Sequence, residues 1–282
     1  MKNTNQDIYI TAKDYLVSEE SFDLLYDSER EMLITSPQPS LENLSKYYES
    51  EDYISHTDNE KGLVNFLYQK VKKSALQSKT SLISKLNNAT GSLLDVGAGT
   101  GDFLNTAKDK GWDIQGVEPN QNARELARSK NVLLKESLDE FSGQQFDVIT
   151  LWHVLEHLPN LKDTIQQIEN LLTPGGTLII AVPNYNSFDA KHYKSFWAAL
   201  DVPRHLWHFS RNSMSKLFSS KLKLVKIKPM IFDSFYVSLL SEKHKNGSSS
   251  FVKAFLVGLW SNISAWRSKE YSSLIYCFKN SK

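Results

Sequence analysis

The strongest constraint on the fold of this 282-residue chain is a regular alternation of apolar runs and amphipathic stretches between residues 92 and 183. The runs have the length and apolar character of buried strands, and the stretches between them carry apolar residues at helical spacing. Strands that alternate with helices in this way form a parallel sheet with helices on both faces. The pattern predicts five strands, at residues 92–97, 113–117, 132–137, 146–151 and 177–183.

The segments on either side complete the predicted fold. Residues 223–229 and 272–279 have the pattern of two further strands. We therefore expect an α/β fold with a doubly wound, mainly parallel, seven-stranded, Rossmann-like sheet and helices on both faces. We divide the chain into an N-terminal leader or lid segment at 1–60 and the α/β domain at 61–282, which carries a helical insertion at about 233–268.

Composition limits the classes of partner and location. The chain has 33 Lys and Arg against 32 Asp and Glu, so it lacks the basic excess typical of nucleic-acid binding, and we expect no nucleic-acid partner. Its single cysteine, Cys277, stands in an apolar run and is expected to be a buried hydrophobic residue. The N-terminus lacks a signal-peptide pattern, and the longest apolar run is about half a membrane span. We expect a soluble, cytoplasmic protein without stable membrane insertion.

The turn after the first predicted strand, in the sequence LLDVGAGTGDFL, has glycines at alternate positions, Gly97, Gly99 and Gly101. A glycine turn between a strand and a helix exposes backbone at the carboxyl edge of the sheet, where doubly wound folds bind ligands. The dinucleotide motif G-x-G-x-x-G is not met, because Asp102 occupies its last position, which argues against NAD and FAD. Glu118, about twenty residues further on at the end of the second strand, can accept both hydroxyls of a ribose. The predicted ligand carries an unphosphorylated sugar diol.

These motifs, together with the later FDVITLWHVLEHL, resemble the class I S-adenosylmethionine-dependent methyltransferases. Within that family, the blocks through VPNYNSFDA to FWAALDVPRHLWHFS resemble the bacterial subgroup related to the ubiquinone-pathway O-methyltransferases, over roughly residues 40–282. The resemblance implies S-adenosyl-L-methionine as the cofactor and in-line transfer of its methyl group. We expect a small-molecule, lipid-precursor or sugar acceptor that is methylated on oxygen; the oligomeric state is left open.

The resemblance also implies contacts to the cofactor by position. The glycine turn with Ala98 would line the methionine part, and Asp95 would fix this loop or bind the amino group. Glu118 would bind the ribose, Ser137 and Leu138 fall where the adenine is contacted, and Trp152 and His153 fall where the chain closes over the donor. The implied cofactor-binding residues are thus Asp95, Gly97, Ala98, Gly99, Gly101, Glu118, Ser137, Leu138, Trp152 and His153.

Candidate catalytic residues fall in two stretches, after the fourth and the fifth predicted strand, and both are expected at the carboxyl edge of the sheet. Transfer to oxygen benefits from a general base, and histidine suits that role near neutral pH. We name His157 and His205 as candidate bases and His153 as a third; His208 belongs to the same group, and a structural hydrogen bond is an equal alternative for each. Arg204 could bind an acidic group on the acceptor.

Two alternatives come from other functional classes. The stretch HVLEH, residues 153–157, matches the H-x-x-E-H signature of zinc proteases. That function requires a long helix, whereas Pro159 follows at once, so our predicted site contains no metal ligand. A weaker version stays open, in which Glu156 and His157 hold a divalent ion as the ubiquinone-type resemblance suggests. The other alternative is a non-catalytic cofactor-binding module or scaffold.

Two aromatic segments lie outside the motifs. Many relatives are expected to begin with a cysteine-bearing ribbon, whereas residues 1–60 of this chain contain no cysteine, which is compatible with a degenerate ribbon. Its aromatic residues Tyr47, Tyr48, Tyr53 and His56 are expected to form a lid over the cofactor pocket or to serve only packing. The stretch FVKAFLVGLWSNISAW is expected to be a packed helical insertion, with a cover for a hydrophobic acceptor or a contact with a membrane surface as alternatives.

Overall fold

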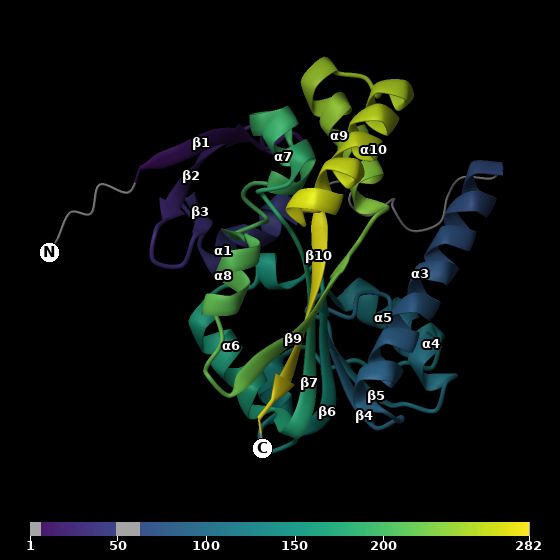
Figure 1. The fold of residues 1–282 in the computed structure, drawn as a ribbon. Helices are drawn as coiled ribbons and strands as arrows, with labels where there is room; N and C mark the ends of the chain where they lie inside the picture. Colours follow the sequence, from purple (N-terminus) through teal and green to yellow (C-terminus); the bar gives the residue numbers. More distant parts are fainter. Residues whose placement is uncertain (1–6, 49–62, 282) are drawn as a thin grey trace, which may run out of the picture.

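The computed structural model describes residues 7–48 and 63–281, and a six-stranded sheet runs through its centre (Figure 1). The strand order is β5-β4-β6-β7-β10-β9. The strands are β4 (Ser92–Val96), β5 (Asp113–Val117), β6 (Phe146–Trp152), β7 (Leu172–Pro183), β9 (Leu222–Pro229) and β10 (Ser273–Asn280). The first four are parallel to one another, whereas β10 is antiparallel to both β7 and β9. The chain reverses its winding direction at β4, so a ligand site is expected at the carboxyl ends of β4 and its neighbours.

Helices pack against both faces, as the sequence predicts. Helices α3 (Leu63–Asn87), α4 (Asp102–Lys108) and α5 (Gln121–Ser129) belong to one face, and α6 (Leu161–Asn170) and α8 (Arg211–Lys216) belong to the other. Consecutive residues of β4 separate the two cores: Leu93 packs in the cluster that contains Ile83 and Phe103, and Leu94 packs in the cluster that contains Ile165. Cys277 is fully buried in the first cluster, as predicted.

The predicted strand at 132–137 is wrong, and the described sheet has six strands instead of seven. The segment makes a single parallel bridge between Val117 and Lys135. After Lys135 the chain turns away from β5, because Ser137 caps a short 3₁₀ helix, η2 (Leu138–Phe141), in a capping box with Glu140. A second difference is that β7 begins at Leu172, and a register irregularity in its pairing with β6 accommodates the turn-like residues 173–176.

The polar N-terminal segment folds as a second sheet instead of a simple leader. Strands β1 (Ile8–Lys13), β2 (Ser21–Asp27) and β3 (Met32–Ser36) form an antiparallel meander, and β8 (Trp207–His208) pairs with β3. Helix α1 (Leu41–Leu44) and the 3₁₀ turn η1 (Ser45–Tyr48) follow. Phe22, Leu24 and Leu33 are buried together with Tyr193 and Trp197. The expected boundary near residue 60 therefore does not separate two cores, because residues 185–208 contribute to this sheet and its packing.

A helical hairpin occupies the range of the expected insertion. Helices α9 (Asp233–Asn246) and α10 (Phe251–Ser268) connect β9 to β10 and pack against each other and against α7 (Phe188–Tyr193). In Figure 1 they project at the top of the molecule, above β10. None of the helices in the described residues has both the length and the apolar character needed to cross a membrane.

Candidate functional site

The glycine turn connects β4 to α4 at the carboxyl edge of the sheet. The backbone N–H groups of Gly97 and Ala98 donate to the carbonyl of Val117 at 2.8 and 2.9 Å, which fixes the turn to the end of β5. Gly97 has a φ of 71°, and a side chain at this position would collide with Val154. Gly99 has a φ of 54° and open space where a side chain would stand. The turn therefore has glycine where a side chain would collide, at Gly97, and where a ligand can approach the backbone, at Gly99.

Glu118 completes this turn from the end of β5. One carboxylate oxygen accepts a hydrogen bond from Gly99 N–H at 2.8 Å, and the other accepts one from Asn120 N–H at 2.9 Å. Each oxygen keeps a further lone pair for another donor. Gly101 ends the turn as the N-cap residue of α4, with a φ of 74°. The structure thus brings the predicted glycine residues together with Glu118, the residue predicted to bind the ribose, in one half-buried cluster.

Asp95 lies beneath the turn and is almost completely buried. Its carboxyl group accepts a hydrogen bond of 2.6 Å from the Thr150 hydroxyl. Burial raises the pKa of Asp95 to about 7, against the opposing effects of Thr150 and of the nearby ammonium of Lys79. A carboxyl group in this state can exist in both protonation states near neutral pH.

Lys79 of α3 is a site residue that the sequence analysis missed. Its Nζ atom lies 4.4 Å from the centre of the Trp152 ring, over the carboxyl end of β6. Burial lowers the pKa of Lys79, and Asp95 and Asp233 act in the opposite direction. The helical pattern of α3 contains several lysines, and nothing in that pattern distinguishes the one that faces the sheet.

Trp152 and His153 stand where β6 ends, beside the glycine turn. The indole Nε1 of Trp152 is buried and has no hydrogen-bond partner among residues 7–48 and 63–281. His153 Nε2 lies 3.3 Å from the Asp233 carboxylate, and its Nδ1 lies 3.5 Å from Glu156. Burial opposes the charge of His153, but these two carboxylates outweigh it and raise the pKa of His153 to about 9. His153 is therefore a cation at neutral pH, which disfavours the predicted role as a general base.

Ser137 and Leu138 are placed near the edge of β5 but serve the fold in this structure. The Ser137 hydroxyl accepts a hydrogen bond from Asp139 N–H as the cap of η2. Leu138 packs against the core on the α6 face. No described contact tests the adenine role, which stays a prediction.

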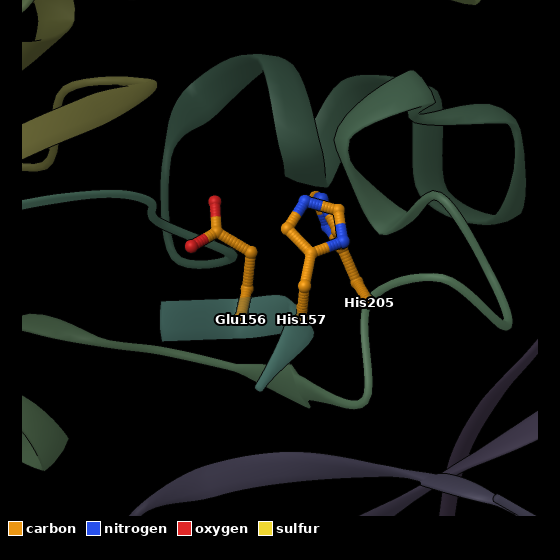
Figure 2. A group of neighbouring side chains, drawn as sticks. All are labelled: Glu156, His157 and His205. Atoms are coloured by element: carbon orange, nitrogen blue, oxygen red, sulfur yellow. The ribbon is translucent and has the colours of Figure 1, made fainter. Parts of the chain in front are cut away.

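A second constellation consists of Glu156, His157 and His205 (Figure 2), and it adjoins His153, which contacts Glu156. Glu156 and His157 belong to the short 3₁₀ turn η3 (Leu155–His157), and His205 belongs to the loop before β8. One ligand atom from each residue lies within 4.8 Å of the other two. Glu156 is 1% exposed, and neither of its carboxylate oxygens has a hydrogen bond within the described part of the chain. Burial opposes its ionisation, but His153 and the neighbouring histidines lower the pKa of Glu156 below its usual value.

The tautomers of the two histidines follow from their neighbours. His157 Nδ1 lies 3.1 Å from the carbonyl oxygen of Arg204, and His205 Nδ1 lies 2.9 Å from that of Ala199. A carbonyl only accepts, so each Nδ1 carries the proton and each Nε2 of a neutral ring carries the lone pair. Burial lowers the pKa of His157 to about 4, which keeps this ring neutral. Two imidazole lone pairs and one carboxylate form a donor set suited to a divalent transition metal.

The remaining polar candidates have structural partners. Arg204 is 1% exposed and donates to Asp14 at 2.9 Å, to Asp201 at 2.7 Å and to the carbonyl of Tyr47 at 2.9 Å. The hypothesis that Arg204 binds an acidic group on the acceptor is therefore wrong. His208 lies 3.0 Å from the Thr35 hydroxyl, and its pKa is lowered to about 3 by burial and by His205.

The structure also places part of the aromatic segment and the H-x-x-E-H stretch. The Tyr48 hydroxyl lies 3.0 Å from His157 Nδ1, whereas the Tyr47 hydroxyl donates a hydrogen bond to the Glu20 carboxylate. Tyr53 and His56 lie outside the described residues. The H-x-x-E-H stretch ends in the three-residue turn η3, so it lacks the long helix of a zinc protease.

Comparisons with known proteins agree with this geometry. A family model described as a methyltransferase domain matches residues 68–221, which is 154 of the 282 residues. The ubiquinone biosynthesis O-methyltransferase of Erwinia tasmaniensis is 32% identical over 106 residues, covering 34% of this chain and 43% of that protein. The enzyme of the same name from Psychrobacter cryohalolentis is 24% identical over 136 residues, covering 44% and 52%. The chain spans about half the length of the curated relatives it matches.

Two solved structures share the fold over most of the chain. The plantazolicin methyltransferase, in complex with a pentazolic desmethyl analogue of plantazolicin and SAH, superposes with a TM-score of 0.55 at 16% identity, over 85% of this chain and 95% of that one. The magnesium protoporphyrin IX methyltransferase from Synechocystis PCC 6803 with bound SAM gives a TM-score of 0.54 at 13% identity, over 86% and 100%. At these identities the likeness concerns the fold alone.

Proposed function

The chain belongs to the methyltransferase domain family, as a class I S-adenosylmethionine-dependent methyltransferase, and from this premise we propose that it methylates an oxygen atom of a small-molecule, lipid-precursor or sugar acceptor. The observation that carries the proposal is the glycine turn tied to Glu118 at the carboxyl edge, inside the matched residues. The curated relatives named above are O-methyltransferases, which supports oxygen as the acceptor atom.

The cofactor is proposed to lie across the ends of β4, β5 and β6. The bare backbone at Gly99 receives its methionine part, and Glu118 accepts hydrogen bonds from its ribose hydroxyls. The methionine part carries both an ammonium and a carboxylate, and the Asp95 carboxyl and the Lys79 ammonium, which interact electrostatically, are the groups proposed to face them. The orphaned indole N–H of Trp152 supplies a further donor at this edge.

Methyl transfer requires the acceptor oxygen to approach the methyl carbon in line with the breaking carbon–sulfur bond. The new oxygen–carbon bond forms with an oxygen lone pair, the carbon–sulfur electrons stay on sulfur as S-adenosylhomocysteine, and the hydroxyl proton is released. The Nε2 atoms of His157 and His205 are the ring positions that would accept this proton, because each Nδ1 contacts a backbone carbonyl. The low pKa of His157 makes it a weak base and favours a role for its lone pair as a ligand instead.

We therefore propose, as a second element of the site, that Glu156, His157 and His205 hold a divalent metal ion. The buried carboxylate of Glu156 is the observation that favours it: its oxygens make no hydrogen bond within the described residues, and its ion pair with His153 is long at 3.5 Å, whereas a buried charge is normally closely paired or bound to a metal. Such an ion would supply Lewis-acid polarisation of an acceptor hydroxyl. The protein residues orient this donor set through the carbonyls that bind both Nδ1–H groups.

Calorimetric titration tests the cofactor assignment. The full chain is titrated with S-adenosylmethionine, with S-adenosylhomocysteine and, as a control, with NAD. We expect saturable one-site binding of the first two and none of NAD. Binding of NAD alone would contradict the assignment, and binding of the first two without turnover on any phenol, hydroxylated lipid or glycan would favour the non-catalytic module.

A further inference from the structure

Helix α10 buries its small residues and exposes its large apolar residues, which is the reverse of an ordinary amphipathic surface helix. Its small residues Ala254, Gly258, Ser261 and Ala265 face the protein and are buried. The large apolar residues point to solvent, with Trp266 77% exposed. The exposed set is Phe251, Val252, Phe255, Leu256, Leu259, Trp260, Ile263 and Trp266. The helix is packed, as the sequence analysis expected, but through its small residues, whereas a helix normally buries its large apolar residues.

The apolar face of α10 is continued by the start of α9. Ile231 and Phe232 precede α9 and are exposed, with Phe232 71% exposed. The Asn262 side chain donates to the Ile231 carbonyl at 3.0 Å, which joins this segment to α10. Monomeric proteins rarely expose so many adjoining large apolar side chains unless the surface has a partner. We call these ten residues the apolar face.

Charged groups around the apolar face are predominantly basic. Lys253 and Arg267 are exposed on α10 itself, and Lys245 is exposed at the end of α9. The acidic groups of the hairpin turn inward, because Glu242 is 4% exposed and Asp233 contacts His153 at 3.3 Å. An anionic surface therefore complements this hairpin, whereas a second copy of the same face would bring like charges together.

We propose that the α9–α10 hairpin docks this protein on the surface of an anionic lipid bilayer. The apolar face enters the boundary between headgroups and acyl chains, and the basic residues contact the headgroups. The helix lies in the membrane plane, because no described helix can span a bilayer. The hairpin begins at Asp233, which contacts His153 and interacts with Lys79, so the hairpin adjoins the candidate site. This inference does not depend on the cofactor or the acceptor.

Co-sedimentation of the full chain with vesicles tests this inference. Vesicles of phosphatidylcholine alone are compared with vesicles that contain phosphatidylglycerol. We expect binding that requires the anionic lipid and weakens with added salt. The double variant Trp260→Ser/Trp266→Ser and the double variant Lys253→Glu/Arg267→Glu are each expected to lower the partition constant by roughly tenfold or more.

Matched controls separate docking from general effects. Leu133→Ser removes an equally exposed apolar side chain elsewhere, and Lys162→Glu reverses a charge on α6; both are expected to bind like the wild type. Thermal unfolding checks that each variant is folded. Binding that is unaffected by lipid charge, or equal in the Trp260/Trp266 variant and the wild type, would overturn the inference. A lipid-free dimer that this variant dissociates would assign the apolar face to a second copy of the chain instead.

Discussion

The carboxylate of Glu118 accepts a hydrogen bond of 2.8 Å from the backbone N–H of Gly99, so the acid at the end of β5 holds the ligand-facing turn that follows β4. The same carboxylate is proposed to accept hydrogen bonds from the ribose hydroxyls of the cofactor. In this proposal it has two functions: it shapes the turn before the cofactor arrives, and it binds the cofactor afterwards.

Glu118→Ala is expected to weaken the binding of S-adenosylmethionine. The substitution removes the proposed hydrogen bonds to the ribose and the support of Gly99, which together correspond to about 2–4 kcal/mol, or roughly a thirty- to thousandfold higher Kd. Calorimetric titration measures the change. Glu136→Ala, which removes an exposed acid on the neighbouring segment, is the control and should bind normally. An unchanged Kd for Glu118→Ala would contradict the ribose assignment.

Asp95 is expected to make the stability of the cofactor-free protein depend on pH. Burial raises its pKa to about 7, well above the usual aspartate value of 3.8, so the folded state binds this proton more tightly than the unfolded state does. Its contribution to the free energy of unfolding is complete below about pH 4 and is lost as the pH rises to about 7, a change on the order of a few kcal/mol.

Chemical unfolding of the wild type and of Asp95→Asn between pH 4 and 8 measures this effect. The difference in unfolding free energy between the two proteins should move in favour of the variant as the pH rises. Asp163→Asn, in the first turn of α6, should show no such trend. A constant difference between Asp95→Asn and the wild type would show that Asp95 is ionised throughout.

Glu156→Gln is expected to abolish the binding of a divalent ion while keeping the fold. The amide has nearly the same shape, but it replaces the one charged ligand of the proposed donor set. Metal content after dialysis against Zn²⁺ or Mn²⁺, with mass-spectrometric detection, should fall from about one ion per chain to none. His205→Gln should behave in the same way, and His192→Gln, an exposed histidine on α7, is the control. Equal metal content in Glu156→Gln and the wild type would exclude this site.

Arg204→Ala is expected to destabilise the protein strongly. The guanidinium is the common partner of Asp14 and Asp201, and its removal leaves two carboxylates without their cation in a buried place. Loss of one partner in such a group costs about 3–5 kcal/mol. Urea unfolding measures it against Arg128→Ala, which removes an arginine from the last turn of α5. A decrease of less than about 1 kcal/mol in the free energy of unfolding would mean that water solvates the Asp14 and Asp201 carboxylates once the guanidinium is removed.

The sequence was sufficient to predict the six strands of the described central sheet and the glycine turn because their signals are local, but it also predicted a seventh strand at 132–137 that does not form. Residues 113–117 form β5 as predicted, since Ile114 and Val117 follow a helix and the glycine that ends it. Gly97 and Glu118 lie close together because parallel neighbouring strands end at one edge, which is a property of the topology. The donor set of Glu156 and His157 was partly visible in the sequence, but the third member, His205, comes from a loop whose path depends on the N-terminal sheet.

The parts that could not be predicted depend on contacts between distant residues. Arg204 has the same sequence signature as a ligand-binding arginine, and only Asp14, which lies 190 positions away, shows that it is structural. The apolar pattern of α10 does not show whether the face with the large residues or the face with the small residues is buried. Its true orientation depends on Gly258, whose missing side chain allows Phe235 of α9 to approach closely.

The pairing of β3 with β8 has a consequence for the order in which the chain can assemble. Leu33 lies opposite His208, so the N-terminal meander is finished by residues that a ribosome adds about 170 positions later. Until then the outer edge of β3 has unpaired backbone groups, which attract other extended chains. Closing a loop of this length is slow compared with forming a hairpin. A nascent chain that has not yet been synthesised as far as residue 207 therefore carries an incomplete sheet. During that interval the exposed edge of β3 is a binding site for chaperones.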